Sequence, residues 1–425
     1  MKNEPTTSLF ELVTGLSEAV DLVSPALVNH HKMVAYFSLC LGTELGLTIE
    51  NISQTVLAGA LHDIGGLSIT ERLEALDFEV EHAHQHAETA YQLLKGFPPF
   101  SKIAEFVRFH HVWWNWGEGR QFRGQAVPIE SHILHLADRI SVLIDKERQV
   151  LSQVNNIRKQ IEDQSQRMFN PEIIEAFKSL AGKEFFWLDS VSGSISSILS
   201  NRIQITTVKL DLDAIIDLAN IFSQIIDFRC KFTANHSSGV AACAERLAEL
   251  AAFSEHDCKK MKVAGYLHDL GKLAVPVDIL NKPSGLSAEE FQIIKSHTYY
   301  TYRILETICG FEKINSWASF HHECLDGGGY PFHLSEPDIS TGSRIMAVAD
   351  VFTALMEDRP YRAGMEKESA LDILQKMADN HKLDAGVVSL LKCNVEVVNK
   401  CRLSAQEVTG NKYHLILEQA ENPEF

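Results

Sequence analysis

Two sets of histidine and aspartate residues follow one another in the same order in the two halves of the chain. The set in the second half comprises His236, His268, Asp269, His297, His321, His322 and Asp350. The set in the first half comprises His30, His62, Asp63, His86, His110, His111 and Asp138. Imidazole and carboxylate groups are the usual ligands of hydrolytic divalent-metal sites. Each half is therefore predicted to carry a metal-binding site.

These residues belong to a longer internal repeat. An offset of 206 residues brings Leu9 onto Ile215 and His30 onto His236, and the offset grows to 211 at His86 and to 212 at Asp138. Apolar residues recur at intervals of three and four in both copies, which is the pattern of amphipathic helices. We predict an all-α protein with two homologous helical domains, residues 1–205 and 206–425. The join is expected near 201–211, where 202–208 has an extended pattern.

A helical bundle explains how ligands that are distant in sequence can meet. The segment from Met261 to Leu270 is predicted to form a helix that Gly271 ends, because glycine is common just beyond helix C-termini. His268 and Asp269 then lie together at a helix end. Side chains of neighbouring helices are expected to converge on that point.

Composition narrows the partners and the location. The formal net charge of −17 argues against duplex nucleic acid or an anionic membrane surface as the main partner. An anionic substrate then requires concentrated positive charge, which metal ions would supply. The sequence contains no stretch of 18 or more apolar residues, so a membrane span is not expected. Residues 1–10 lack the pattern of a secretory signal. Eight scattered cysteines without a CxxC pair suit a reducing cytoplasm.

Several motifs of the second half resemble the HD-GYP family of the HD phosphohydrolases. The H…HD…D pattern is formed by His236, His268-Asp269 and Asp350. The further matches are Gly271-Lys272, Ile279-Leu280-Asn281-Lys282-Pro283, His297, His321-His322-Glu323, Asp326-Gly327-Gly328-Gly329-Tyr330-Pro331 and Asp358-Arg359-Pro360-Tyr361-Arg362. The resemblance implies two tandem HD-type bundles. It also implies hydrolysis of cyclic di-GMP, or of cyclic GMP-AMP, with iron or manganese ions.

The resemblance assigns roles to particular residues. His236, His268, Asp269 and Asp350 would bind one metal ion. His297, His321 and His322 would bind a second, with Asp269 between the two ions. Lys272 would contact the phosphate and act in catalysis with Asp269. Arg359 and Arg362 would contact phosphate or guanine, or remain surface residues, and Tyr330 would shape the pocket or stack on a base.

Three departures from the family pattern modify these expectations. Phe232 stands where three-metal members carry a glutamate, so two divalent ions are expected. Thr353 replaces a common aspartate. In the first half Gly66 replaces the lysine, and Trp113-Trp114-Asn115-Trp116 stands in place of the GYP loop.

The first half keeps all seven ligand-type residues, so a further metal site is predicted there. Three roles stay open for this half: a regulatory or dimerising partner, a phosphomonoesterase that trims the linear product, or a nucleotide sensor. The second half is predicted to open a cyclic dinucleotide to a linear one. The alternatives are a general HD-type nucleotide phosphohydrolase and a metal-binding signalling scaffold without turnover. A homodimer is compatible with the sequence.

Overall fold

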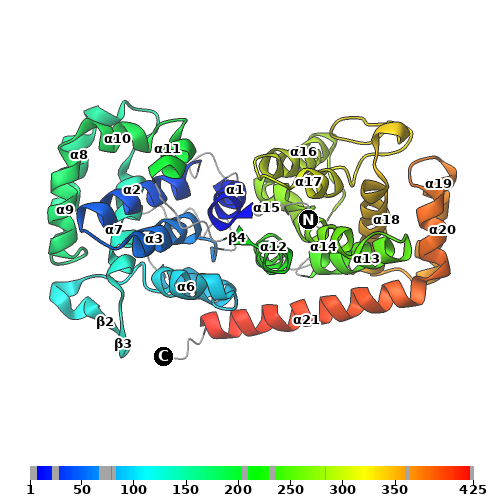
Figure 1. Cartoon of the computed structure of the whole chain (residues 1–425), viewed down its shortest axis with the longest axis horizontal. Helices are drawn as coiled ribbons and strands as arrows, with labels where there is room; N and C mark the ends of the chain where they lie inside the picture. The colour runs from blue at the N-terminus through cyan, green and yellow to red at the C-terminus, as the bar shows by residue number, and fades with distance from the viewer. Residues whose placement is uncertain are drawn as a thin grey trace. The chain divides into compact units, whose positions relative to one another are not determined.

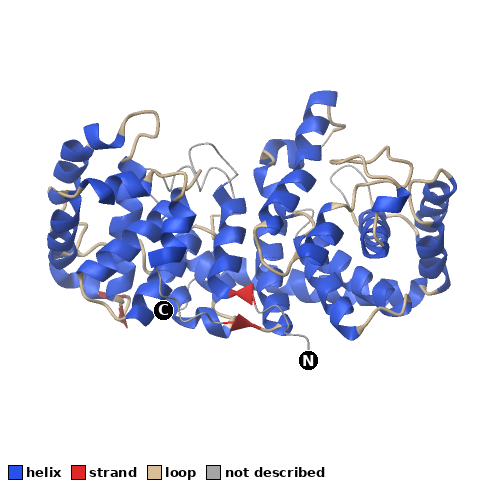
Figure 2. Cartoon of the chain, turned by 45° about the horizontal axis from the view of Figure 1, so that its top comes forward, coloured by secondary structure: helices blue, strands red, loops and turns tan. Residues whose placement is uncertain are grey.

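Helices make up most of the described part of the protein (Figure 2). The computed structural model describes residues 7–21, 28–66, 78, 83–202, 209–228, 235–282, 284–358 and 363–421. Within these residues the strands are two-residue segments: β1 (Thr7–Ser8) pairs with β4 (Lys209–Leu210), and β2 (Gln121–Phe122) pairs antiparallel with β3 (Gln125–Ala126). The prediction of an all-α fold is confirmed.

The chain forms two compact units. One comprises Lys209–Leu415 with the first seven residues, and the other comprises Ser8–Val208 with the last ten. Helix α11 (Ile195–Arg202) is the last described helix before Lys209. The extended pattern expected for 202–208 therefore falls, apart from Arg202, outside the described residues.

The bundle of the second half is built around α13, which packs against α14 and α18 (Figure 1). Its helices are α12 (Leu212–Asp227), α13 (His236–Leu250), α14 (Glu255–Leu267), the 3-10 helix η5 (Leu270–Ala274), α15 (Val277–Leu280), α16 (Ala288–Glu306), α17 (Glu312–Ser319), the 3-10 helix η6 (Glu336–Asp338), α18 (Thr341–Met356), α19 (Lys367–Asp379), α20 (Ala385–Cys393) and α21 (Val395–Glu421).

The bundle of the first half has α2 at its centre, packed against α3 and α7. Its helices are α1 (Leu9–Asp21), α2 (His30–Glu44), α3 (Ile49–Leu61), α5 (Ala83–Leu94), η2 (Pro98–Phe100), α6 (Ser101–Arg108), η3 (Asn115–Arg120), α7 (Ile129–Leu143), η4 (Val150–Ser152), α8 (Val154–Glu162), α9 (Pro171–Ala181), α10 (Glu184–Ser190) and α11.

Helix boundaries follow the sequence repeat. Moved by 206 residues, the bounds of α2 and α3 coincide with those of α13 and α14, and α6 moved by 211 coincides with α17. The N-caps coincide too: Thr48 accepts a hydrogen bond from the backbone N–H of Asn51, and Ser254 accepts one from that of Asp257. Such caps stabilise a helix start by about 1 kcal/mol. The two halves therefore build one helical frame twice.

Two glycines in each copy let the helices approach closely. A Cβ on Gly265 would lie 2.4 Å from the Cα of Ala241, and one on Gly271 would lie 1.9 Å from the carbonyl oxygen of His297. At the matching positions, a Cβ on Gly59 would lie 3.0 Å from the Cα of Ala35, and one on Gly65 would lie 2.1 Å from the oxygen of His86. At Gly65, Gly265 and Gly271 these contacts leave no room for a Cβ, and at Gly59 a Cβ would fit only tightly.

The expected role of Gly271 was wrong in detail. Helix α14 ends at Leu267, and Gly271 lies inside η5 rather than ending the helix. Its physical reason is the contact with α16, since its backbone N–H also donates to Thr301 Oγ1 at 2.9 Å. The placement of His268 and Asp269 just beyond a helix end is confirmed.

We predict that Gly271→Ala destabilises the second half of the chain, because the new methyl group would collide with the backbone of His297. Overpacking of this kind costs about 1–3 kcal/mol or more. Urea unfolding followed by circular dichroism measures the effect. Gly285→Ala is the matched control, because a Cβ there has no atom of the described residues within 4 Å. Equal unfolding midpoints for the two variants would contradict the packing argument.

Candidate metal centres

The seven predicted ligands of the second half come from five helices that meet at one place. His236 begins α13, His268 and Asp269 directly follow α14, and His297 lies in α16. His321 and His322 follow α17 by one residue, and Asp350 lies in α18. Three overlapping groups have ligand atoms within 4.8 Å of one another: His236, His268 and Asp350; His268, Asp269 and His321; and His297, His321 and His322.

Asp269 lies between two groups of histidines. Its Oδ2 is 3.2 Å from His268 Nε2, and its Oδ1 is 3.4 Å from His297 Nε2. On the first side, His236 Nε2 is 3.2 Å from Asp350 Oδ1. On the second side, His297 Nε2 is 3.3 Å from His321 Nε2. The two carboxylate oxygens thus face different groups, which is the arrangement of a bridging ligand.

Backbone carbonyls orient the histidine rings. His268 Nδ1 donates to the oxygen of Gly265 at 2.8 Å, and His297 and His321 donate to the oxygens of Ile294 and Ala318, each at 2.6 Å. A carbonyl only accepts, so the Nδ1 atoms carry the protons and the Nε2 lone pairs face the cluster. Hydrogen bonds of this kind fix metal-binding imidazoles in other proteins.

His236 is oriented by a buried chain of side chains instead. Its Nδ1 lies 2.9 Å from Glu357 Oε2, and the other carboxylate oxygen of Glu357 accepts a hydrogen bond from Gln406. Arg402 in turn donates to Gln406 Oε1 at 2.6 Å. All three of these side chains are buried. Sequence reasoning missed them because Gln406 and Arg402 lie on α21, which the internal repeat does not include.

Burial sets the protonation of the ligands. Burial lowers the pKa of His297 to about 3 and holds that of His321 well below its usual value. Burial alone would raise the pKa of Asp269, but the charges of His268 and Lys272 outweigh it and hold the pKa well below the usual range. Neutral imidazoles and ionised carboxylates are the forms that bind metal.

Lys272 and the GYP loop adjoin this cluster. Lys272 Nζ donates to Asp269 Oδ2, three residues earlier. Glu323 accepts hydrogen bonds from the backbone N–H groups of Phe332 at 2.7 Å and Leu334 at 3.0 Å, so the third residue of the His-His-Glu motif holds the loop in place. The Tyr330 ring then lies 5.0 Å from the ring of His322. The sequence identified Glu323 as part of the His-His-Glu motif but did not predict that it anchors the loop.

Further residues were singled out from the sequence. Arg359, Arg362 and Phe232 lie outside the described residues. Thr353 is buried, and its hydroxyl lies 3.6 Å from Cys243 Sγ on α13.

The seven ligand-type residues of the first half also meet. His62 Nε2 is 3.1 Å from Asp63 Oδ2, and His86 Nε2 is 3.3 Å from Asp63 Oδ1. His30 Nε2 is 3.4 Å from Asp138 Oδ1. Two groups have ligand atoms within 4.8 Å of one another: His30, His62 and Asp63; and Asp63, His86, His110 and His111. Asp63 repeats the position of Asp269.

One cation distinguishes this cluster from the other. Lys272 has Gly66 as its counterpart, but Arg139, directly after Asp138, donates to Asp138 Oδ2 from Nε at 3.1 Å and also from Nη2. Arg139 is buried, and its counterpart in the second half is Val351. Burial alone would raise the pKa of Asp138, but the charges of Arg139, His62 and His30 together outweigh it and lower that pKa. The position of Arg139 directly after the repeated Ala-Asp dipeptide was a signal in the sequence from which this contact could have been predicted.

Both clusters fit divalent metal ions. Among the described residues, the buried atoms His268 Nε2, His110 Nε2, Asp63 Oδ1 and Asp138 Oδ1 have no hydrogen-bond partner. Leaving buried polar atoms unpaired is costly, and a cation among them would satisfy several at once. Burial lowers the pKa of His62, but Asp63 outweighs it and raises that pKa to about 9, so a bound cation would compete with a proton there.

Comparison with known proteins agrees with this geometry. Models of the HD domain match residues 27–143 and 220–387. The 3′3′-cGAMP-specific phosphodiesterase 1 of Vibrio cholerae is 27% identical over 394 residues, which cover 89% of this chain and 90% of that protein. Its phosphodiesterase 3 is 34% identical over 64% of this chain and 59% of that protein. A cyclic di-GMP phosphodiesterase of Thermotoga maritima is 32% identical over 47% and 55%.

A solved structure shares the fold. The crystal structure of a cyclic GMP-AMP-specific phosphodiesterase of Vibrio cholerae superposes with a TM-score of 0.66 at 23% identity, covering 92% of this chain and 98% of that one. The chain belongs to the HD-domain family, with two HD domains of which the second is of the HD-GYP type. No helix among the described residues is long and apolar enough to cross a membrane.

We predict that Glu357→Ala weakens metal binding in the second half about 10- to 100-fold, because His236 loses the carboxylate that orients its ring. Metal content after dialysis, measured by mass spectrometry of the elements, reports the change. Glu407→Ala, an exposed position on the same helix as Gln406, is the control. Unchanged metal content in Glu357→Ala would show that this chain of side chains does not orient His236.

Proposed function

We propose that the second HD domain hydrolyses a 3′,5′-phosphodiester bond of a cyclic dinucleotide and opens the ring to a linear dinucleotide. The observation that carries the proposal is Asp269, whose two oxygens face two histidine groups while Lys272 adjoins it. Relatives named as cyclic-dinucleotide phosphodiesterases support the reaction class.

The first substrate to assay is 3′,3′-cyclic GMP-AMP, with cyclic di-GMP as the second. The relative that extends over both halves is named for the former. The Thermotoga maritima relative, named for the latter, matches less than half of the chain. Either substrate fits the general chemistry of the site.

The proposed roles follow the geometry. His236, His268, Asp269 and Asp350 would hold one ion, and His297, His321 and His322 a second, with Asp269 shared. Two divalent ions, when bound, supply a hydroxide nucleophile and stabilise charge on the phosphoryl oxygens. Histidine and carboxylate ligands suit iron or manganese. Lys272 would bind a phosphate oxygen, Tyr330 would border the substrate pocket, and Arg359 and Arg362 are proposed as further substrate contacts.

The first HD domain is proposed to bind metal through its own seven residues. A role in regulation or dimerisation and a role in trimming the linear product are both compatible with a metal centre that lacks the lysine and the GYP loop. The negative net charge and the scattered cysteines support a cytoplasmic enzyme without a duplex nucleic acid partner.

Turnover of both cyclic dinucleotides with Mn²⁺ or Fe²⁺ tests the main proposal. We expect His268→Ala to lose at least 100-fold in ring opening, because the ion proposed for His236, His268, Asp269 and Asp350 loses a ligand, and His62→Ala to keep most of it. Product analysis by liquid chromatography gives the rates. A wild-type chain that opens neither ring with either metal would refute the proposal. Equal losses in both variants would refute the assignment to the second domain.

Lys272→Ala is expected to lower kcat/KM about 10- to 100-fold while the metal content stays at the wild-type level, because the lysine contacts the phosphate but is not a ligand. Removal of one preorganised oxyanion-hole donor costs about 100- to 1000-fold in kcat, and a lysine whose charge is shared with Asp269 is expected to contribute less. Lys313→Ala, an exposed lysine in the same domain, is the control. Loss of metal in Lys272→Ala would assign the residue to the metal site instead.

A further inference from the structure

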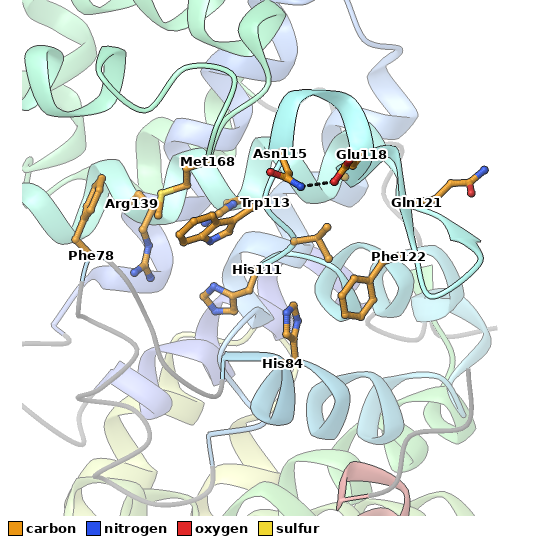
Figure 3. A pocket seen from close by; sticks show the side chains of 13 residues that line it. Phe78, His84, His111, Trp113, Asn115, Glu118, Gln121, Phe122, Arg139 and Met168 are labelled. Atoms are coloured by element: carbon orange, nitrogen blue, oxygen red, sulfur yellow. Dashed lines mark hydrogen bonds between the residues drawn. The ribbon is translucent and has the colours of Figure 1, made fainter.

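A cavity of about 610 Å³ opens beside the metal ligands of the first HD domain (Figure 3). Its lining includes one ligand of the cluster, His111, and the cation next to another, Arg139. The volume lies within the range of small-molecule binding sites. The cavity therefore joins a group that can hold metal to a space that can hold a ligand.

One side of the cavity suits an anion. His111 Nε2 is 3.0 Å from His86 Nε2, and both belong to the group that Asp63 and His110 complete. Arg139 contacts Asp138 in the way that Lys272 contacts Asp269 in the other domain, although the two residues occupy different positions of the repeat. The first domain thus lacks the lysine but keeps one cation beside a predicted metal-binding carboxylate.

Flat aromatic groups form another part of the wall. Trp113 is half-buried and lines the cavity together with His111 and His84 (Figure 3). The His84 and Phe122 rings lie 4.7 Å apart. The Arg167 guanidinium lies 5.0 Å from the centre of the Trp113 ring. Rings of this kind bind nucleobases by stacking, largely without regard to sequence.

The segment that carries Trp113 is held in an unusual backbone conformation. Asn115 and Trp116 have backbone φ angles of 44° and 52°, and residues other than glycine rarely adopt such positive values. The backbone N–H groups of Trp114 and Asn115 donate to the oxygens of Met168 at 3.1 Å and Arg167 at 2.8 Å. Asn115 also donates to Glu118, another residue of the wall. Strained conformations that the surroundings enforce cluster at functional sites.

We propose that this cavity binds a nucleotide with a terminal phosphomonoester, the phosphate toward His111 and Arg139 and the base against Trp113. The inference rests on the proposed metal binding of the first domain and is independent of ring opening by the second. A monoester carries close to two negative charges at neutral pH, as phosphorylated side chains do, and so suits a cation and a metal centre better than a diester does.

Isothermal titration calorimetry of the full-length chain with AMP and with GMP, in the presence of Mn²⁺, tests the site. The His268→Ala background takes a ligand from the other metal centre, and the tryptophan substitutions change only the first domain, so the measurement does not depend on the main proposal. We expect binding of AMP or GMP, at least tenfold weaker binding of adenosine or guanosine, and at least tenfold weaker binding of the nucleotide by Trp113→Ala. Trp113→Phe should stay within about threefold, because a stacking ring remains.

Trp116→Ala is the matched control: this tryptophan is 69% exposed and does not line the cavity. It should bind the nucleotide as the background chain does, and metal content should be equal in all tryptophan variants. Equal affinity in Trp113→Ala and Trp116→Ala, equal affinity for nucleoside and nucleotide, or no binding of either nucleotide would each overturn the proposal. Ring opening by the otherwise wild-type Trp113→Ala chain, assayed separately, should be unchanged.

Discussion

The concentration of imidazoles and carboxylates in the interior of each bundle is the constraint on which the rest of the structure depends. Buried polar groups are costly unless they are paired, and here the pairing has two parts. Backbone carbonyls occupy the Nδ1 atoms of His268, His297 and His321. The Nε2 atoms then face Asp269 and Asp350, where a cation would complete the pairing. The helix ends must meet closely for this, which explains the lack of space for a side chain at Gly265 and Gly271.

The two domains share this frame and differ in what surrounds it. Helices α2, α3 and α6 repeat as α13, α14 and α17 with the same lengths, so the ligand positions are the same. The differences lie where the helices end. Glu323 anchors the GYP loop in one domain, whereas the Trp113 segment is held by residues 166–168 in the other. A common metal frame with different loops is a physical basis for two ligand preferences in one chain.

The sequence predicted which histidines and aspartates meet, because their spacing is the spacing of helix ends. His62 and His268 follow helices of equal length with equivalent caps at Thr48 and Ser254, so the intervals survive even where other residues differ. The residues that orient the ligands could not be found in this way. Glu357 and Gln406 meet His236 only through tertiary packing, and Gly271 is constrained by a helix about thirty residues away in sequence. Neither contact leaves a periodic signal.

Charge explains why metal would serve substrate binding as well as chemistry. Burial keeps His297, His321 and His322 below their usual pKa, so these rings carry little positive charge at neutral pH. Asp269 and Asp350, whose pKa values are held well below the usual range despite burial, contribute two negative charges. Among the described residues that adjoin the cluster, Lys272 supplies one positive charge in return. These two carboxylates and one lysine do not give the site the concentrated positive charge that an anionic substrate needs. Two divalent cations would supply it, so a protein with a net charge of −17 would attract an anionic dinucleotide to this site.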